Sequence, residues 1–199
     1  IGEGTTAVNQ YMFYGGTNWG GLLNPEVYTS YDYGACIREY GFISNRYRYL
    51  RRFALFLQAF ETQLARTDRV EQPELSISPN RMGFVERRTP SGTWFAFLRN
   101  LSFDAAESSC TIGGHESEAR IFEHTIQLEP QASFITVGKL AVGPFSLLFS
   151  SYEILTCGPY GDAHLLVVCD NGGWLFFDER TRIQVNGLMD VIRKEGALA

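Results

Sequence analysis

The stretch "NQYMFYGGTNWGG", residues 9–21, runs from aromatic residues typical of a β-strand straight into a loop of glycine, threonine and asparagine. A second stretch, "YTSYDYG" at 28–34, places three tyrosines around one aspartate. Sugars need both kinds of residue, because their hydroxyl groups require directional hydrogen bonds and the C–H face of a pyranose requires an aromatic plane. The two stretches therefore favour a carbohydrate site, and packing of the same rings in a core is the alternative.

The composition excludes several other classes of protein. At 199 residues and 45% hydrophobic, the chain can bury one sizeable core or two small ones, so it is not a disordered protein. Its 17 basic and 22 acidic residues are spread along the chain, and the formal charge of −5 leaves no basic stripe for a nucleic acid. No apolar run reaches the roughly 18 residues of a spanning helix. We therefore expect neither a nucleic-acid partner nor a membrane span.

The glycine-rich loop does not fit a phosphate site either. The segment "GGTNWGG" at 15–21 lacks the GK[ST] ending of a P-loop and the GxGxxG spacing of a dinucleotide-binding loop.

The chain begins at Ile1 without a basic and apolar leader, and its first recognisable element is already a strand that ends in a loop. We therefore expect the chain to be a piece of a longer protein.

The two motifs strongly resemble the end of the catalytic domain of glycoside hydrolase family 35, the retaining β-galactosidases. "NQYMFYGGTNWG" at 9–20 follows the pattern N-x-Y-M-x-x-G-G-T-N-[FW]-G of that family, and T-S-Y-D-Y follows at 29–33. The resemblance implies the last β/α unit of a (β/α)₈ TIM barrel. Tyr11 and Met12 would then lie on the eighth strand, with residues 15–34 as the loop after it.

The resemblance also implies roles for five residues. Tyr11 and Tyr33 match family tyrosines that contact galactose, so they are the expected substrate-binding residues; packing inside the barrel is the alternative for Tyr11. Asn18 and Asp32 are expected to organise the loop, because amides and carboxylates beside glycines commonly bind backbone N–H groups in turns. Trp19 is expected either to form one wall of the pocket or to pack beneath it.

No catalytic residue is expected within this chain. A retaining mechanism needs two carboxylates about 5 Å apart, and in the family both are glutamates on earlier barrel strands, upstream of Ile1. Asp32 and Glu39 are poor substitutes, because nothing in the motif places them around a sugar. Many relatives have Asp-Ala-Pro where this chain has Gly-Ala-Cys at 34–36, which leaves the fine substrate preference open. The chain alone is therefore expected to be inactive.

The rest of the chain divides into a helix, a linker and a β-rich region. Residues 44–66 have apolar side chains at helical spacing, with Ser44 as a plausible N-cap, so residues 1–66 are expected to be the end of the barrel. Residues 67–79 are polar and carry two prolines, which predicts a linker. Residues 80–199 are expected to form an antiparallel, sandwich-like second domain. Its predicted strands and hairpin lie at 93–101, 124–128, 133–137, 145–155, 163–168 and 169–177, the hairpin having its turn at Asn171-Gly172.

The remaining signals are weak. Four cysteines at irregular spacing and three histidines match no disulfide framework or zinc pattern, so no metal and no cofactor are expected. One glycosylation sequon occurs at Asn100-Leu101-Ser102. The resemblance favours an extracellular or lysosome-like location, with a cytoplasmic one as the alternative. The expected partners are a β-galactoside and the remainder of the barrel.

A second hypothesis is a non-catalytic carbohydrate-binding module. In that case the aromatic residues at 94–97 and 174–177 would form a binding platform, although paired rings in a strand more often belong to a core. Exposure of Trp94 and Trp174 separates the two hypotheses.

Overall fold

The structure is a computed structural model, in which two compact units can be distinguished. We call Thr6–Gln58 the hairpin unit, and Ile1–Thr5 together with Ala59–Ala199 the β-rich unit. The residues that the structure describes are 1–18, 28–73, 75–78, 82–104, 106–112, 122–169, 175–177, 193–194 and 197–198.

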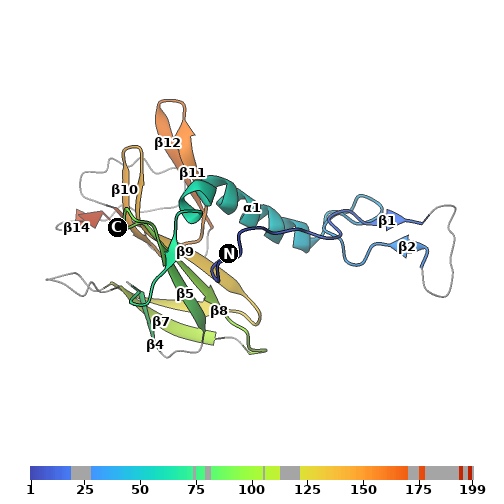
Figure 1. The fold of residues 1–199 in the computed structure, drawn as a ribbon, viewed down its shortest axis with the longest axis horizontal. Helices are drawn as coiled ribbons and strands as arrows, with labels where there is room; N and C mark the ends of the chain where they lie inside the picture. Colours follow the sequence, from blue (N-terminus) through green and yellow to red (C-terminus); the bar gives the residue numbers. More distant parts are fainter. Residues whose placement is uncertain are drawn as a thin grey trace. The chain divides into compact units, whose positions relative to one another are not determined.

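The hairpin unit contains two short strands and most of the helix (Figure 1). Strand β1 (Gly16–Thr17) pairs antiparallel with β2 (Ser30–Tyr31), so that Gly16 lies opposite Tyr31 and Thr17 opposite Ser30. After β2 the chain folds back beside its own start. There Ile37 forms a parallel bridge with Tyr14 and accepts a hydrogen bond from the Gly15 amide at 2.8 Å.

The expected barrel strand at Tyr11 and Met12 is not present. Both residues lie in a turn, and Met12 has a φ of 58°, which is outside the β region. A parallel strand takes its hydrogen bonds from neighbouring strands. Among the described residues of the hairpin unit, the parallel pairing is limited to the bridge between Tyr14 and Ile37. The local sequence alone therefore does not hold this segment in an extended conformation.

Helix α1 (Asn45–Leu64) agrees with the helix expected over 44–66. Ser44 stands at the N-cap position, and its carbonyl accepts a hydrogen bond from the Tyr47 amide at 3.2 Å. Its hydroxyl donates to the carbonyls of Cys36 and Ala35, at 2.9 and 3.2 Å. Ser44 therefore ties the start of the helix to the loop after β2. Among the described residues, no helix is both long and apolar enough to cross a membrane.

The β-rich unit consists of antiparallel sheets, as the sequence predicts. The order of the largest is β14-β15-β13-β10-β9-β6-β5-β3; β4-β7-β8 form a three-stranded sheet, and β11 pairs with β12. Strands β3 and β4 lie within 67–79, where the sequence predicts a linker. The strand bounds are β3 Asp68–Arg69, β4 Leu75–Ser78, β5 Gly83–Arg88, β6 Trp94–Arg99, β7 Ala106–Ile112, β8 Phe122–Leu128, β9 Ser133–Val142, β10 Phe145–Ser150, β11 Ile154–Tyr160, β12 Ala163–Val168, β13 Leu175–Phe177, β14 Arg193–Lys194 and β15 Ala197–Leu198.

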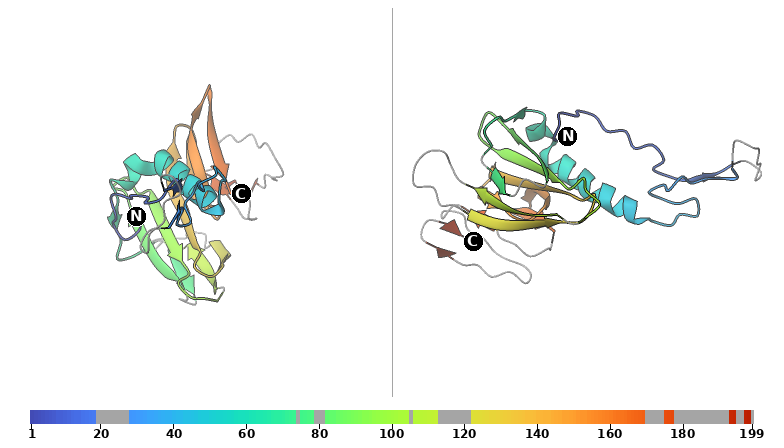
Figure 2. Two further views of the ribbon diagram at one scale, coloured as in Figure 1. Left: turned by 90° about the vertical axis from the view of Figure 1, so that its right-hand side faces the viewer. Right: turned by 90° about the horizontal axis from the view of Figure 1, so that it is seen from below.

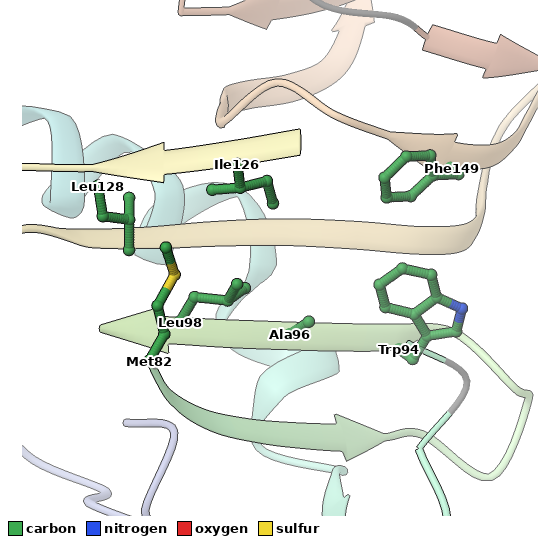
Figure 3. Close-up of a cluster of buried hydrophobic side chains, with 7 residues drawn as sticks. All are labelled: Met82, Trp94, Ala96, Leu98, Ile126, Leu128 and Phe149. Carbon is green, nitrogen blue, oxygen red and sulfur yellow. The ribbon is translucent and has the colours of Figure 1, made fainter. Parts of the chain in front are cut away.

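The core lies between β6 and β8. Alternate residues of a strand point to opposite faces, so Trp94, Ala96 and Leu98 share one face of β6. They pack against Ile126 and Leu128 of β8 (Figure 3). The two inner faces thus meet as in a sandwich, with Met82 and Phe149 completing the cluster.

The other face of β6 is covered by the end of α1. Phe95 is fully buried, and its ring meets that of Phe60 edge to face with 5.5 Å between the centroids. Burial on both faces explains why the β6 sequence is an almost continuous apolar run.

Trp94 also has a close backbone neighbour. Its ring stacks on Phe149, with 6.1 Å between centroids, and lies over Gly138, its partner in β9. A Cβ atom at Gly138 would overlap the Trp94 ring. Residue 138 must therefore lack a side chain for the indole to keep this position.

The described strands that flank the hairpin expected at 169–177 do not pair with each other. The turn of that hairpin, Asn171-Gly172, lies outside the described residues, but the strands on either side belong to different sheets: β12 pairs with β11, and β13 pairs with β10 and β15. The β11–β12 hairpin, orange in Figure 1 and Figure 2, lies beside the turn between β9 and β10, where the Gly143 backbone meets the His164 ring.

The sequon asparagine is a structural residue. Asn100 is fully buried, and its side-chain amide donates to the carbonyls of Asp104, Leu128 and Glu129 at 2.7, 3.2 and 3.1 Å. Its Oδ1 accepts from the amide and the hydroxyl of Ser102, at 3.0 and 2.7 Å. Asn100 thus joins the turn after β6 to the end of β8.

Candidate functional site

Three tyrosines from the two motifs lie together in the hairpin unit. The hydroxyls of Tyr11 and Tyr31 are 2.7 Å apart, and the rings of Tyr31 and Tyr33 meet edge to face with 5.0 Å between centroids. The exposed fractions of Tyr11, Tyr31 and Tyr33 are 69%, 37% and 63%. The hydrogen bond with Tyr11 raises the pKa of Tyr31 above its ordinary value, so this hydroxyl stays protonated. We call these residues the tyrosine cluster.

The backbone at Tyr33 is unusual. Its φ is 42° and that of the next residue, Gly34, is 70°, so two successive residues adopt the left-handed conformation. For a bulky residue this conformation is costly, and such strain persists only where the surroundings impose it. Here the Ala35 amide donates to the Asp32 carbonyl at 2.8 Å and closes the turn around Tyr33. The turn therefore fixes the direction of the Tyr33 side chain.

The Asp32 side chain is largely buried. It is only 14% exposed, and Oδ2 forms an ion pair with the Arg38 guanidinium. Its Oδ1 is buried, has no hydrogen-bond partner in the described part of the chain, and lies against the Gly15 backbone, where a Cβ atom would overlap it. Asp32 therefore packs the loop from within and is poorly placed to meet a ligand.

Asn18 connects the ends of the two described segments, at residues 18 and 28–29. Its backbone amide donates to the Thr29 carbonyl at 2.8 Å, and its side-chain amide donates to the Tyr28 carbonyl. The backbone contact extends the pairing of β1 with β2 by one step. Trp19 lies outside the described residues, so its expected place at the pocket wall stays a prediction, as do the binding roles of Tyr11 and Tyr33.

Glu39 is the residue whose place the sequence did not predict. Oε1 accepts a hydrogen bond from the Thr17 hydroxyl at 2.8 Å, and Oε2 accepts one from the Ser30 hydroxyl. These two bonds lower the pKa of Glu39 below its ordinary value of 4.5, because they favour the charged carboxylate. The sequence does not show that this carboxylate has two hydroxyl partners, because residue 39 meets the two strands only after the chain folds back.

Other candidates offer less chemistry. Within the described residues, no three His, Cys, Asp or Glu side chains gather in a way that could hold a metal ion. Cys36 is fully buried beside Ala35. Trp94 belongs to the core, so it is not available as the sugar platform of a binding module, and Trp174 lies outside the described residues.

A family model described as glycosyl hydrolases family 35 matches residues 1–56. Probable beta-galactosidase C of Sclerotinia sclerotiorum is 32% identical over 171 residues, which are 84% of this chain and 17% of that protein. Probable beta-galactosidase B of Talaromyces marneffei is 31% identical over 162 residues, which are 78% of this chain and 16% of that protein. The chain thus spans about one sixth of the length of these relatives.

These similarities place the chain among the glycoside hydrolases. Within that class it belongs to glycosyl hydrolases family 35, whose model covers both tyrosine-rich motifs. The resemblance seen in the sequence is therefore confirmed. The relatives align with most of the chain, so the similarity continues beyond the motifs into the β-rich unit.

Proposed function

We propose that the chain is part of a retaining β-galactosidase that removes terminal, non-reducing β-D-galactose residues from glycans. In this proposal Tyr11 and Tyr33 bind the galactose, and the two catalytic glutamates belong to a part of the protein upstream of residue 1. Family membership and the names of the relatives support this activity. The observation that carries it is the exposed tyrosine cluster, which offers both hydroxyl groups and ring faces.

The surroundings of the two carboxylates near the cluster support the proposal that the catalytic glutamates lie outside residues 1–199. Asp32 is largely buried and paired with Arg38, while both oxygens of Glu39 accept hydrogen bonds from hydroxyl groups. A general acid or a nucleophile must instead reach the glycosidic bond. We therefore expect residues 1–199 alone to release no galactose. Turnover that is abolished by Asp32→Ala would refute this expectation.

We further propose that residues 1–66 complete a TIM barrel in the parent protein and that residues 80–199 form its second domain. The hairpin unit leaves many large hydrophobic side chains exposed, and in soluble proteins such exposure commonly marks a surface that another part of the protein covers. In the parent, the remainder of the barrel would cover this surface and supply the neighbours that a strand near Tyr11 lacks. The tyrosine cluster stays open to the sugar in this proposal; the other large hydrophobic side chains exposed there are Val8, Phe13, Tyr14, Tyr28, Tyr40, Phe42, Ile43 and Tyr49.

The test is the hydrolysis of a nitrophenyl β-galactoside by the parent protein. Tyr11→Phe and Tyr33→Phe each remove one hydroxyl group, and each should raise KM about tenfold, equivalent to about 1.4 kcal/mol. Tyr160→Phe is the matched control, because this tyrosine is 72% exposed and lies on β11. NMR of the first product should show the β anomer, as retention requires. Unchanged KM in both cluster variants would refute the assignment of these tyrosines.

A further inference from the structure

We propose that Glu39 is a positioning residue of the galactose site, whose carboxylate joins β1 to β2 and thereby holds the tyrosine cluster in place. This inference rests on the proposed function, since positioning matters for activity only if the cluster binds the sugar. Glu39 itself lies beside the strands and contacts none of the three cluster side chains in the hydrogen bonds described above.

The geometry is that of a bridge between paired strands. Thr17 of β1 and Ser30 of β2 are direct partners in the strand register. Each donates its hydroxyl to a different oxygen of the same Glu39 carboxylate. The Glu39 backbone carbonyl also accepts a hydrogen bond from the Tyr14 hydroxyl at 3.3 Å. One residue thus connects both strands with the segment that precedes β1.

A bridge of this kind matters because the strands are short. β1 and β2 have two residues each, and an isolated two-stranded ribbon is only marginally stable in water. Hydrogen bonds to a charged acceptor are stronger than bonds between neutral groups. The Glu39 carboxylate is charged at neutral pH, and the two hydroxyl donors favour this charged form, as the lowered pKa of Glu39 indicates. The side-chain bridge therefore adds to a backbone pairing that is weak by itself.

The bridge and the cluster share one strand. Tyr31 follows Ser30 directly in β2 and lies opposite Gly16 of β1. Its hydroxyl bonds with Tyr11 and its ring contacts Tyr33. Movement of β2 relative to β1 would displace Tyr31, and with it the two proposed galactose contacts. Glu39 can therefore influence sugar binding without touching the sugar.

The first part of the test is steady-state kinetics of the parent protein with a nitrophenyl β-galactoside. Glu39→Gln preserves size, but the amide nitrogen cannot accept a hydrogen bond, so one hydroxyl loses its partner. We expect KM to rise about tenfold while kcat changes by less than about twofold, the pattern for lost binding that is uniform in ground and transition states. Glu71→Gln, at an exposed position in the β-rich unit, is the matched control.

The second part separates a bridge from general stability. The double variant Thr17→Val/Ser30→Ala removes both donors and should raise KM as Glu39→Gln does. Adding Glu39→Gln to it should then change KM no further, because the three residues act as one unit. If Glu39→Gln fails to fold, Ser30→Ala alone, which removes a single donor, tests the same bridge. A lower melting temperature with unchanged KM in these variants would overturn the positioning role.

Hydrogen exchange distinguishes failure of the bridge from failure of the proposed function. The Asn18 amide bonds the Thr29 carbonyl across the strand pair, so Glu39→Gln should make it exchange faster. Unchanged exchange together with unchanged KM would overturn the inference. An inactive unsubstituted parent would overturn the proposed function and the positioning role with it, and the exchange rates would still decide whether the bridge exists.

Discussion

Replacing Asn100 with alanine should be among the most damaging single changes to the β-rich unit. The substitution removes an amide whose two N–H groups are shared among the carbonyls of Asp104, Leu128 and Glu129, and an Oδ1 that accepts from the amide and the hydroxyl of Ser102. A buried polar group left without a partner costs about 1–3 kcal/mol. Water can reach the exposed turn around Asp104 and Ser102, so the uncompensated loss falls mainly on the buried carbonyl of Leu128 and on the space left behind.

We therefore expect Asn100→Ala to lower the free energy of unfolding by about 2–4 kcal/mol. With a urea m-value of about 2 kcal/mol/M, the unfolding midpoint should fall by about 1–2 M, which far-ultraviolet circular dichroism can follow. Asp104→Ala is the matched control. Asn100 bonds the Asp104 backbone carbonyl, so removing the Asp104 side chain should change stability by less than about 0.5 kcal/mol. A loss below about 1 kcal/mol for Asn100→Ala would refute the reasoning.

Three further predictions concern packing, reactivity and pH. Gly138→Ala should destabilise the chain by about 1–3 kcal/mol in urea unfolding, because its methyl group overlaps the neighbouring indole, whereas Gly158→Ala, with open space around it, should not. Burial raises the pKa of Cys157 to about 11, so at pH 8 iodoacetamide should modify it about 100-fold more slowly in the folded chain than in urea; equal rates would contradict the burial. The pKa of Glu39 is lowered on folding, so its contribution to stability is complete above its ordinary pKa of 4.5 and is lost as pH falls through the lowered value. The stability difference between Ser30→Ala and the unsubstituted chain should therefore be present at pH 7 and vanish in acid.

The elements that the sequence predicts well are those whose local pattern matches their surroundings. Helix α1 has its apolar residues at helical spacing, which predicts a helix over 44–66, and the helix spans Asn45–Leu64. Strand β6 is apolar from Trp94 to Leu98, because it is covered on both faces. In both elements, the apolar residues of the sequence lie at the positions that are buried in the structure.

Two elements could not be predicted, because distant parts of the chain decide them. Strand β5 has the sequence "GFVERR", in which Glu86 is buried and paired with Arg88 at 2.7 Å. Buried carboxylates are rare without a partner, and their burial cannot be read from the strand itself. The segment at Tyr11 and Met12 has residues of strand type, yet lies in a turn, because the neighbours of a parallel strand are not local.

The candidate site shows the same division. The motifs indicate Tyr11 and Tyr33 as candidate residues, and the turn at Tyr33 agrees with the glycine that follows it at 34. The contribution of Tyr31 as the link between them, and of Glu39 as a bridge, depends on strand register and on a chain reversal. Side-chain contacts of that kind have no signature in residue spacing.

Because Trp94 and Gly138 are in contact, these two positions, which are distant in the sequence, can only be substituted together. Because the ring occupies the space of a Cβ atom, residue 138 can gain a side chain only if residue 94 gives up volume at the same time. In a library randomised at both positions, folded members should be pairs with a compensating sum of volumes, and single replacements should be depleted. Evolutionary substitution at these two positions must therefore pass through a single variant that has either a cavity, if residue 94 changes first, or a steric clash, if residue 138 changes first.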